Sequence, residues 1–299
     1  MVLIGVRRSL ELGRGGAPPR FGERQRSRVQ IAPGPLMDEM TPELKLAISQ
    51  LANALSLAVE ASLRSPRTAW VLFSGGLDSS VLAKLAGEKK PGIRLLTVGT
   101  KDSEDARFAF EIAKELGLPL DFIELNVQKI AELKERARPF SRTDMDVELA
   151  IPLLAACEFA RGGLLLAGSG AEELFLGYAR HRRAFERGED LEALRRLELA
   201  SLRQKDLARN EAIAAAYDVE LALPYLHPLV VEAALCLPAR LNFSQGRRKF
   251  FLQLAARMLG VPEAAIARPK RALQYASGVH KLLKRSVQGA RSSSSGESY

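Results

Sequence analysis

Four short apolar segments, each followed by turn residues and then a helix-like segment, constrain the fold of this chain most strongly. They are AWVLF (69–73), IRLLTV (93–98), DFIEL (121–125) and GLLLA (163–167). Helical spacing follows them, as in SEDARFAFEIAKELG, which closes at Gly117. Strands that alternate with helices are joined by crossovers and build parallel sheets covered on both faces. The sequence therefore predicts an α/β fold with a mainly parallel sheet flanked by helices.

The part of the chain after Gly168 carries helical spacing, and we expect no further strand there. Apolar residues recur every three or four positions in residues 171–185, 190–217, 228–237 and 247–259. Another helix precedes the first strand, with Thr41 as its N-cap and Pro42 at its first helical position. Its apolar face consists of Leu44, Ile48, Leu51, Leu55 and Val59. We expect a helical C-terminal part packed on the sheet, and a helix with one buried side before it.

The basic charge of the chain is concentrated at its two ends. The formal net charge is +9 over 299 residues, yet residues 1–37 hold seven Lys or Arg against two Glu, and residues 268–299 hold seven against one. This leaves −2 for the residues between them. A slightly acidic body does not provide the broad basic surface that follows nucleic-acid phosphates. We therefore expect no nucleic-acid partner.

The remaining composition indicates a globular protein of a reducing compartment. A hydrophobic content of 47% is enough for a sizeable core. Cys157 and Cys236 lie far apart without any C-x-x-C, and the three histidines lack metal-ligand spacing, which argues against a disulfide framework and against a zinc site. No apolar run approaches the roughly 20 residues of a membrane span. We expect a cytoplasmic protein without membrane association, and the oligomeric state stays open.

Composition also divides the chain into three parts. Residues 1–36 mix Gly, Pro and Arg without apolar periodicity, and we expect a disordered or non-native extension there. Two other interpretations are a targeting peptide, because the segment is rich in Arg, and a start placed too early, with Met37 or Met40 as the natural beginning. Residues 37–290 are expected to form the folded domain, and residues 291–299 a disordered tail.

The turn in VLFSGGLDSS (71–80) predicts an anion site. Ser74, Gly75 and Gly76 follow the first strand, and a helix is expected from about Leu77. Exposed amides and the helix dipole at such a place bind phosphate. The chain lacks the lysine-containing P-loop motif and the dinucleotide G-x-G-x-x-G motif. Asp78 would repel a phosphate unless a cation lay between them, which indicates Mg²⁺.

The order S-G-G-x-D-S resembles the PP-loop of the N-type ATP pyrophosphatases, which split ATP into AMP and pyrophosphate. The resemblance implies that ATP and Mg²⁺ bind here, with Asp78 as a metal ligand. It implies nucleotide contacts from Phe73, Ser74, Gly75, Gly76, Asp78 and Ser79. A second carboxylate is expected to share the metal.

A second loop, LLLAGSGAEELFLGY (164–178), is similar to the asparagine synthetase motif S-G-E-G-A-D-E-L-F-G-G-Y. It matches at Gly168, Gly170, Ala171, Glu173, Leu174, Phe175, Gly177 and Tyr178. The metal-binding aspartate of the family falls on Glu172, Gly168 would contact the nucleotide, and Glu173 is a candidate catalytic residue. Ser169, also a candidate, stands where the family has a glutamate on the substrate side of the AMP, so the departure concerns the amino-acid substrate.

Further matches follow toward the C-terminus. The backbone at Val98 and Gly99 would hold the adenine edge. Lys249 corresponds to the catalytic lysine of the family, and Lys270 lies with Arg268 in its R-x-K segment. Fixed cations of this kind stabilise the negative charge that develops on an α-phosphate and on leaving pyrophosphate.

One stretch departs from the family's E-x-R-x-P-F-L-D pattern. Ala222 replaces the arginine, and His227 replaces the aspartate. We interpret His227 as a structural substitute before Pro228 rather than as a base.

The resemblance covers roughly residues 45 to 285. It implies a Rossmann-like fold of the adenine nucleotide alpha hydrolase-like type, and it makes residues 37–290 an asparagine synthetase-like ATP-pyrophosphatase domain. The implied activity is that of an ATP-dependent amidotransferase or ligase, which adenylates a small-molecule carboxylate such as aspartate before an amine attacks. Position 2 is Val2 rather than the cysteine of a glutaminase domain, so we expect ammonia from solution or from a separate glutaminase subunit. The alternatives are a PP-loop tRNA-modifying enzyme and a non-catalytic ATP-binding protein.

Overall fold

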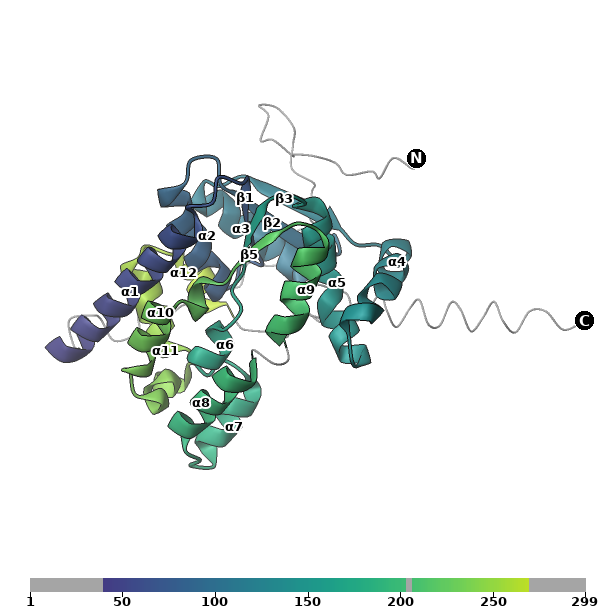
Figure 1. Ribbon diagram of the computed structural model, residues 1–299. Helices are drawn as coiled ribbons and strands as arrows, with labels where there is room; N and C mark the ends of the chain where they lie inside the picture. Colours follow the sequence, from purple (N-terminus) through teal and green to yellow (C-terminus); the bar gives the residue numbers. More distant parts are fainter. Residues whose placement is uncertain (1–39, 203–205, 269–299) are drawn as a thin grey trace, which may run out of the picture.

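A five-stranded parallel sheet forms the centre of the computed structural model, which describes residues 40–202 and 206–268 (Figure 1). The strand order is β3-β2-β1-β4-β5, and every neighbouring pair is parallel. The strands are β1 (Ala69–Leu72), β2 (Arg94–Gly99), β3 (Leu120–Glu124), β4 (Leu164–Leu166) and β5 (Glu220–Ala222). The predicted Rossmann-like α/β class is confirmed.

The expectation that no strand follows Gly168 is wrong, because β5 lies beyond it. β5 pairs with β4 in the register Leu164↔Glu220 and Leu166↔Ala222. Its backbone bonds run from the Glu220 amide to the Gly163 carbonyl and from the Ala167 amide to the Ala222 carbonyl, both 2.9 Å long. A three-residue strand is too short to show an apolar period of its own. Its extended form depends on pairing with the edge of β4.

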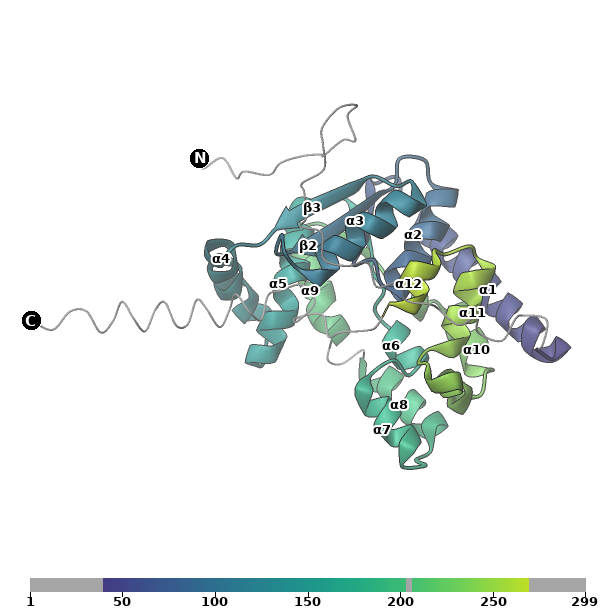
Figure 2. The same ribbon diagram turned by 180° about the vertical axis from the view of Figure 1, so that it is seen from behind.

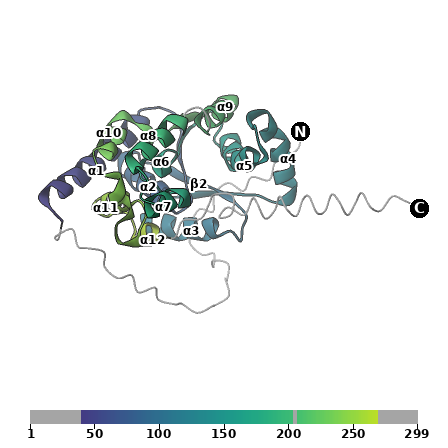
Figure 3. The same cartoon turned by 90° about the horizontal axis from the view of Figure 1, so that it is seen from below.

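Two cores cover the two faces of the sheet. Along β1, Val71 enters the core that contains α1, α2, α3, α10, α11 and α12, while Trp70 and Leu72 pack against the core of α4, α5 and α9. This alternation follows from the period of two in a strand. In the view from below, α1, α10 and α11 lie on the left and α4 and α5 on the right (Figure 3).

The helices of the first layer are α1 (Pro42–Ser62), α2 (Leu77–Lys89), α3 (Glu104–Leu116), α10 (Pro228–Leu235), α11 (Phe250–Met258) and α12 (Glu263–Ala267). Those of the second layer are α4 (Val127–Ala137), α5 (Asp144–Phe159) and α9 (Ala208–Ala216), with the short 3₁₀ turn η2 (Arg138–Phe140) between α4 and α5. Thr41 caps α1 as predicted, since its hydroxyl accepts a hydrogen bond from the Leu44 amide.

A smaller third layer projects below the sheet in Figures 1 and 2. It contains α6 (Ala171–Leu174), α7 (Ala179–Glu186), α8 (Leu191–Leu202) and the 3₁₀ segment η5 (Ala239–Gly246); another 3₁₀ turn, η4 (Pro224–Leu226), follows β5. The predicted helical stretch 190–217 is divided between α8 and α9. The layer has its own core, made of Leu176, Ala184, Leu191, Ala239 and Phe243.

The strand order places one crevice at the centre of the sheet. From β1 the chain moves outward through β2 and β3, and it then returns to the other side of β1 with β4. Ligands of open parallel sheets bind where the direction reverses, beyond the carboxyl ends of the strands. The loops after β1 and β4 are the two predicted binding loops, and they meet at this point.

Parts of the predicted domain boundaries lie outside the described residues, namely 1–36, 291–299 and the end of 37–290. Among the helices that the structure describes, none is long and apolar enough to cross a membrane.

Candidate nucleotide site

The loop after β1 is held in a compact turn by its own serines. The Ser79 hydroxyl accepts a hydrogen bond from the Ser74 amide at 3.3 Å and donates one to the Gly76 carbonyl at 3.1 Å. Gly76 is the N-cap of α2, and no described side chain caps this helix. No described side chain therefore occupies the first amides of α2, where the sequence predicts that an anion binds.

Gly75 lets this loop lie directly against α3. Its φ of 69° is in the left-handed region, and a Cβ at this position would come within 2.7 to 2.8 Å of the backbone of Phe108 and Ala109. On the strand side, the Thr97 hydroxyl donates to the Phe73 carbonyl at 2.6 Å. α3 and β2 thus support the loop from behind.

Three side chains from distant segments meet in front of the loop. The Lys249 ammonium lies 2.7 Å from each carboxylate oxygen of Asp78 and 2.5 Å from Oε1 of Glu172. Asp78 comes from the first turn of α2, Glu172 from α6, and Lys249 is the N-cap of α11 with φ 57°. Burial alone would lower the pKa of Lys249, but the two carboxylates raise it above its ordinary value. The group therefore stays a cation.

The two carboxylates fit the predicted magnesium ion. Asp78 and Glu172 already converge on one cationic atom, so their oxygens can share a single charged ligand. Mg²⁺ is commonly held by one or two carboxylates together with substrate phosphates. Among the described residues, no group of three or more His, Cys, Asp or Glu side chains is arranged so that it could hold a metal ion. The two carboxylates therefore suit a metal ion that is also bound by the phosphates of a nucleotide.

Gly177 has no side chain, which leaves space for the side chains of Glu172 and Lys249. A Cβ there would come within 2.1 Å of both Oε2 of Glu172 and Cε of Lys249. The turn is held by bonds from the Gly177 amide to the Glu172 carbonyl (2.8 Å) and from Arg248 to the Gly177 carbonyl (2.9 Å). The motif match identified Gly177, but its role becomes visible only in three dimensions.

Tyr225 is a contact that the sequence reasoning missed. Its hydroxyl donates to the backbone carbonyl of Asp78 at 3.0 Å, and its ring packs edge-on against Phe175. Burial raises the pKa of the Tyr225 phenol well above 10, so it remains a neutral donor. Tyr225 lies in η4 at the phenylalanine position of the E-x-R-x-P-F-L-D pattern, but the pattern does not indicate its contact with Asp78.

Glu173 and Ser169 stand apart from this cluster. The Glu173 carboxylate is buried and accepts a hydrogen bond from the Tyr178 hydroxyl at 2.9 Å. Burial raises the pKa of this carboxyl group. Ser169 is half-buried in the loop after β4. His227 caps α10 through a bond from the Leu229 amide to its Nδ1, which is the structural role expected of it.

β2 extends beyond β1 toward the crevice, and this separates the two predicted adenine contacts. The register with β1 ends at Leu96, whereas the register with β3 continues to Gly99. The Leu96 carbonyl accepts from the amide of Phe73, and the Gly99 carbonyl accepts from that of Leu125. Backbone groups alternate in direction along a strand, so those of Val98 face the β1 side beyond the end of β1. Val98 is thus the better placed of the two, and the predicted catalytic Lys270 lies outside the described residues.

The chain matches one family model over most of its length. The model, described as asparagine synthase, matches residues 50–195 and 183–296. The chain belongs to the asparagine synthase family.

Two relatives illustrate the similarity. A putative asparagine synthetase [glutamine-hydrolyzing] 1 of Methanocaldococcus jannaschii is 32% identical over 274 residues, which cover 78% of this chain and 50% of that protein. Asparagine synthetase domain-containing protein 1 of Gallus gallus is 29% identical over 300 residues, with coverages of 73% and 47%. The chain spans about half the length of these curated relatives. Among solved structures, NMN synthetase from Francisella tularensis aligns with a TM-score of 0.42 at 16% identity, covering 78% of this chain and 77% of that one.

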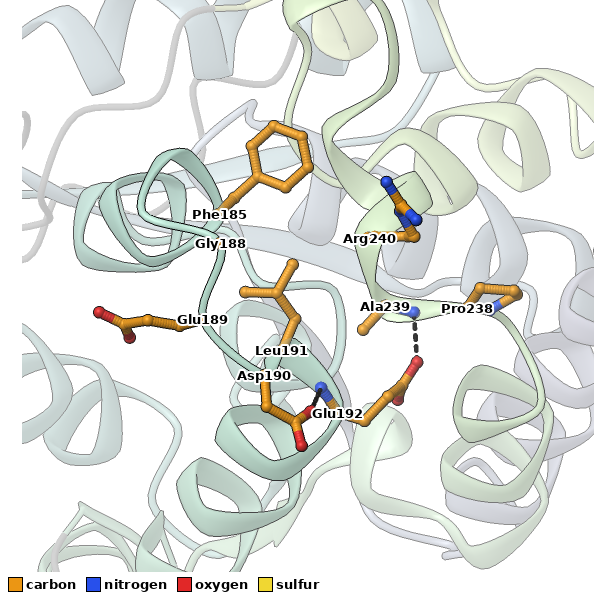
Figure 4. Close-up of a pocket in the computed structure, with 9 residues that line it drawn as sticks. All are labelled: Phe185, Gly188, Glu189, Asp190, Leu191, Glu192, Pro238, Ala239 and Arg240. Atoms are coloured by element: carbon orange, nitrogen blue, oxygen red, sulfur yellow. Dashed lines mark hydrogen bonds between the residues drawn. The ribbon is translucent and has the colours of Figure 1, made fainter.

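A cavity lies away from the candidate site and involves none of its loop residues (Figure 4). It lies between the α7–α8 turn and the start of η5. Its lining consists of Phe185, Gly188, Glu189, Asp190, Leu191, Glu192, Pro238, Ala239 and Arg240. Two of its acidic side chains form hydrogen bonds with the backbone. Asp190 accepts from the Glu192 amide at 3.0 Å, and Glu192 accepts from the Ala239 amide at 2.7 Å. We interpret this cavity as a structural junction between α8 and η5.

Proposed function

We propose that this asparagine synthase family member is an ATP-dependent ligase that adenylates a substrate carboxylate, releases pyrophosphate, and transfers the acyl group to an amine. The observation that carries the proposal is the convergence of Asp78, Glu172 and Lys249 in front of the loop after β1, with oxygen–nitrogen distances of 2.5 to 2.7 Å. Family membership supports ATP-dependent ligase chemistry.

The residues divide the work between binding and charge stabilisation. The amides of Gly75, Leu77 and Asp78 would hold phosphate oxygens at the positive end of α2, whereas the Gly76 amide donates to Ser74 Oγ at 3.4 Å. Asp78 and Glu172 would hold Mg²⁺, which when bound neutralises phosphate charge and orients the nucleotide. Lys249 would stabilise the additional negative charge on the α-phosphate and the leaving pyrophosphate, because it is buried and its two carboxylate neighbours raise its pKa.

The proposed reaction has two steps. A carboxylate oxygen attacks the α-phosphorus, an acyl–phosphate bond forms, and the bond between the α- and β-phosphates breaks to release pyrophosphate. An amine nitrogen then attacks the acyl carbon, the carbon–oxygen bond to AMP breaks, and the amine loses a proton. Ser169 lies in the loop where the acyl substrate would bind, and the family has a glutamate at this position. We therefore propose that the substrate of this protein makes a different contact here from the one that aspartate makes in the family.

A product assay tests this function. The protein is incubated with Mg·ATP, a panel of amino acids and other small carboxylates, and an amine donor, and AMP, ADP and pyrophosphate are quantified. We expect AMP and pyrophosphate in equal amounts, dependent on one carboxylate. ADP and phosphate as products, or no cleavage of ATP with any acid, would refute the proposal.

Variants link this activity to the site. Lys249→Met should abolish AMP release, whereas Lys89→Met is a matched control. Lys89 also forms an ion pair, with Glu60 at 3.0 Å, but on the surface of α2. Equal activity of both variants would contradict the role of Lys249.

The nitrogen source requires its own experiment. We propose that the chain uses free ammonia or ammonia delivered by a separate glutaminase subunit. Ammonium chloride and glutamine are compared as donors for the purified protein. Amide product with ammonium and none with glutamine is expected, and glutamine-dependent product from the purified chain would contradict this part.

A further inference from the structure

We propose that Arg268 is a positioning residue that sets the orientation of the phosphate-binding loop after β1. The proposal rests on the proposed nucleotide-binding function and adds to it a residue that acts through the loop rather than on the substrate. Arg268 follows α12 and is the C-cap of that helix. It reaches the loop from a segment 194 positions further along the chain.

Three contacts fix the guanidinium group of Arg268. Nη1 donates a hydrogen bond to the carbonyl oxygen of Ser74, and Nη2 lies 2.6 Å from Oδ1 of Asp105 in the first turn of α3. The guanidinium carbon is 4.2 Å from the centre of the Phe108 ring. Only 7% of the Arg268 side chain and 9% of that of Asp105 are exposed. A charge held by partners on three sides has a fixed place.

This arrangement determines how the next peptide group is directed. The carbonyl of Ser74 and the amide of Gly75 belong to one planar trans peptide unit, so they point in opposite directions. With the carbonyl held by Arg268, the Gly75 amide is directed away from that side. The backbone of Phe108 and Ala109 stands 2.7 to 2.8 Å from where a Gly75 Cβ would be, so the loop cannot retreat toward α3. Arg268 thus directs the Gly75 amide toward the anion and keeps the Ser74 carbonyl oxygen turned away from it.

The chemistry of the contacts favours arginine over lysine. The planar guanidinium offers separate N–H groups to two acceptors while its face stacks on a ring. The ammonium group of a lysine could not form hydrogen bonds with the Ser74 carbonyl and the Asp105 carboxylate and also stack on the Phe108 ring. The Asp105 carboxylate compensates the positive charge, which suits a residue that orients the loop and leaves phosphate binding to the amides.

Direct measurement of ATP binding tests this inference independently of turnover. The dissociation constant of Mg·ATP is measured by calorimetry for the wild type, Arg268→Ala, Arg268→Lys and Asp105→Asn. We expect a weakening of about 10- to 100-fold for Arg268→Ala, the effect of losing one hydrogen bond from the Gly75 amide to a charged phosphate. Arg268→Lys should remain weakened, and Asp105→Asn should be intermediate. Arg257→Ala is the matched control, since Arg257 forms a more exposed pair with Glu263 at 2.6 Å, also beside α12.

Chemical rescue separates positioning from general packing. Guanidinium or methylguanidine at concentrations far below denaturing ones should restore part of the ATP affinity of Arg268→Ala, and should not change that of Arg257→Ala. Thermal unfolding of each variant establishes that it is folded. Wild-type affinity in Arg268→Ala, full affinity in Arg268→Lys, or absence of rescue would overturn the assignment. ATP binding without AMP release in the wild type would refute the ligase function and leave this test in force.

Discussion

Lys249→Met is the perturbation whose effect the structure defines most sharply. The lysine side chain is 7% exposed, and its partners Asp78 and Glu172 are 19% and 10% exposed. Removal of one partner from a buried ion pair leaves uncompensated charge and costs about 3–5 kcal/mol. At about 2–4 °C per kcal/mol for a domain of 150 to 250 residues, the melting temperature should fall by about 6–20 °C.

The assay is urea and thermal unfolding with a metal chelator present, and then with Mg²⁺ or Mn²⁺ but no nucleotide. Because the two carboxylates converge on one point, a divalent cation should bind the methionine variant and recover part of the lost free energy of unfolding. The double variant Lys249→Met/Asp78→Asn should not respond to metal. Lys89→Met, at an exposed pair, should lose only about 0–1 kcal/mol.

The result has a defined pH dependence. The folded pKa of Lys249 is raised, so the stability from its charge is fully present below the ordinary lysine value of 10.5 and is lost only as pH rises through the higher folded value. The difference between wild type and variant should therefore not decline between pH 7 and 9. A loss below about 1 kcal/mol, or a variant indifferent to divalent metal, would refute the reasoning from the converging carboxylates.

Three further predictions concern single contacts. Gly177→Ala should lower kcat/KM for ATP by about 100-fold or more, because its Cβ would come within 2.1 Å of the Glu172 carboxylate and displace it; steady-state kinetics measure this. Tyr225→Phe should lose about 0.5–1.5 kcal/mol in urea unfolding, through one hydrogen bond to Asp78, and an unchanged midpoint would contradict this contact. Burial lowers the pKa of His181 below 6.5, so the unfolded chain binds the proton more readily and the wild type should lose up to about 1.4 kcal/mol per pH unit below pH 6.5. His181→Gln should lack this part of the slope.

The sequence predicted the features that have a local signature. Four of the five strands lie within a residue or two of the predicted segments, because a short apolar run before turn residues identifies a buried strand on its own. The loop at Ser74–Gly76 and the acidic start of α6 were predicted for the same reason. β5 was missed, since its three residues are extended only through pairing with β4.

Contacts between distant segments were beyond sequence reasoning. The motif marked Lys249 as catalytic, but its position between Asp78 and Glu172 depends on the packing of α11 against α1 and α2. The Arg268–Asp105 pair joins the chain after α12 to the start of α3, and neither residue has a pattern that names the other. Such pairs result from tertiary packing, which a single sequence does not encode in any local period.

The long separations within this site also govern when it comes into being. Asp78 meets Lys249 across 171 positions of the chain and Tyr225 across 147. Closing loops of this size is slow compared with forming a local helix, so the candidate nucleotide site should be among the last parts to assemble during folding. A ligand that binds only the completed site stabilises finished molecules by mass action and leaves partly folded ones unaffected. As the proposed ligand, ATP should therefore protect from proteolysis only those molecules in which all of these distant pairs have formed.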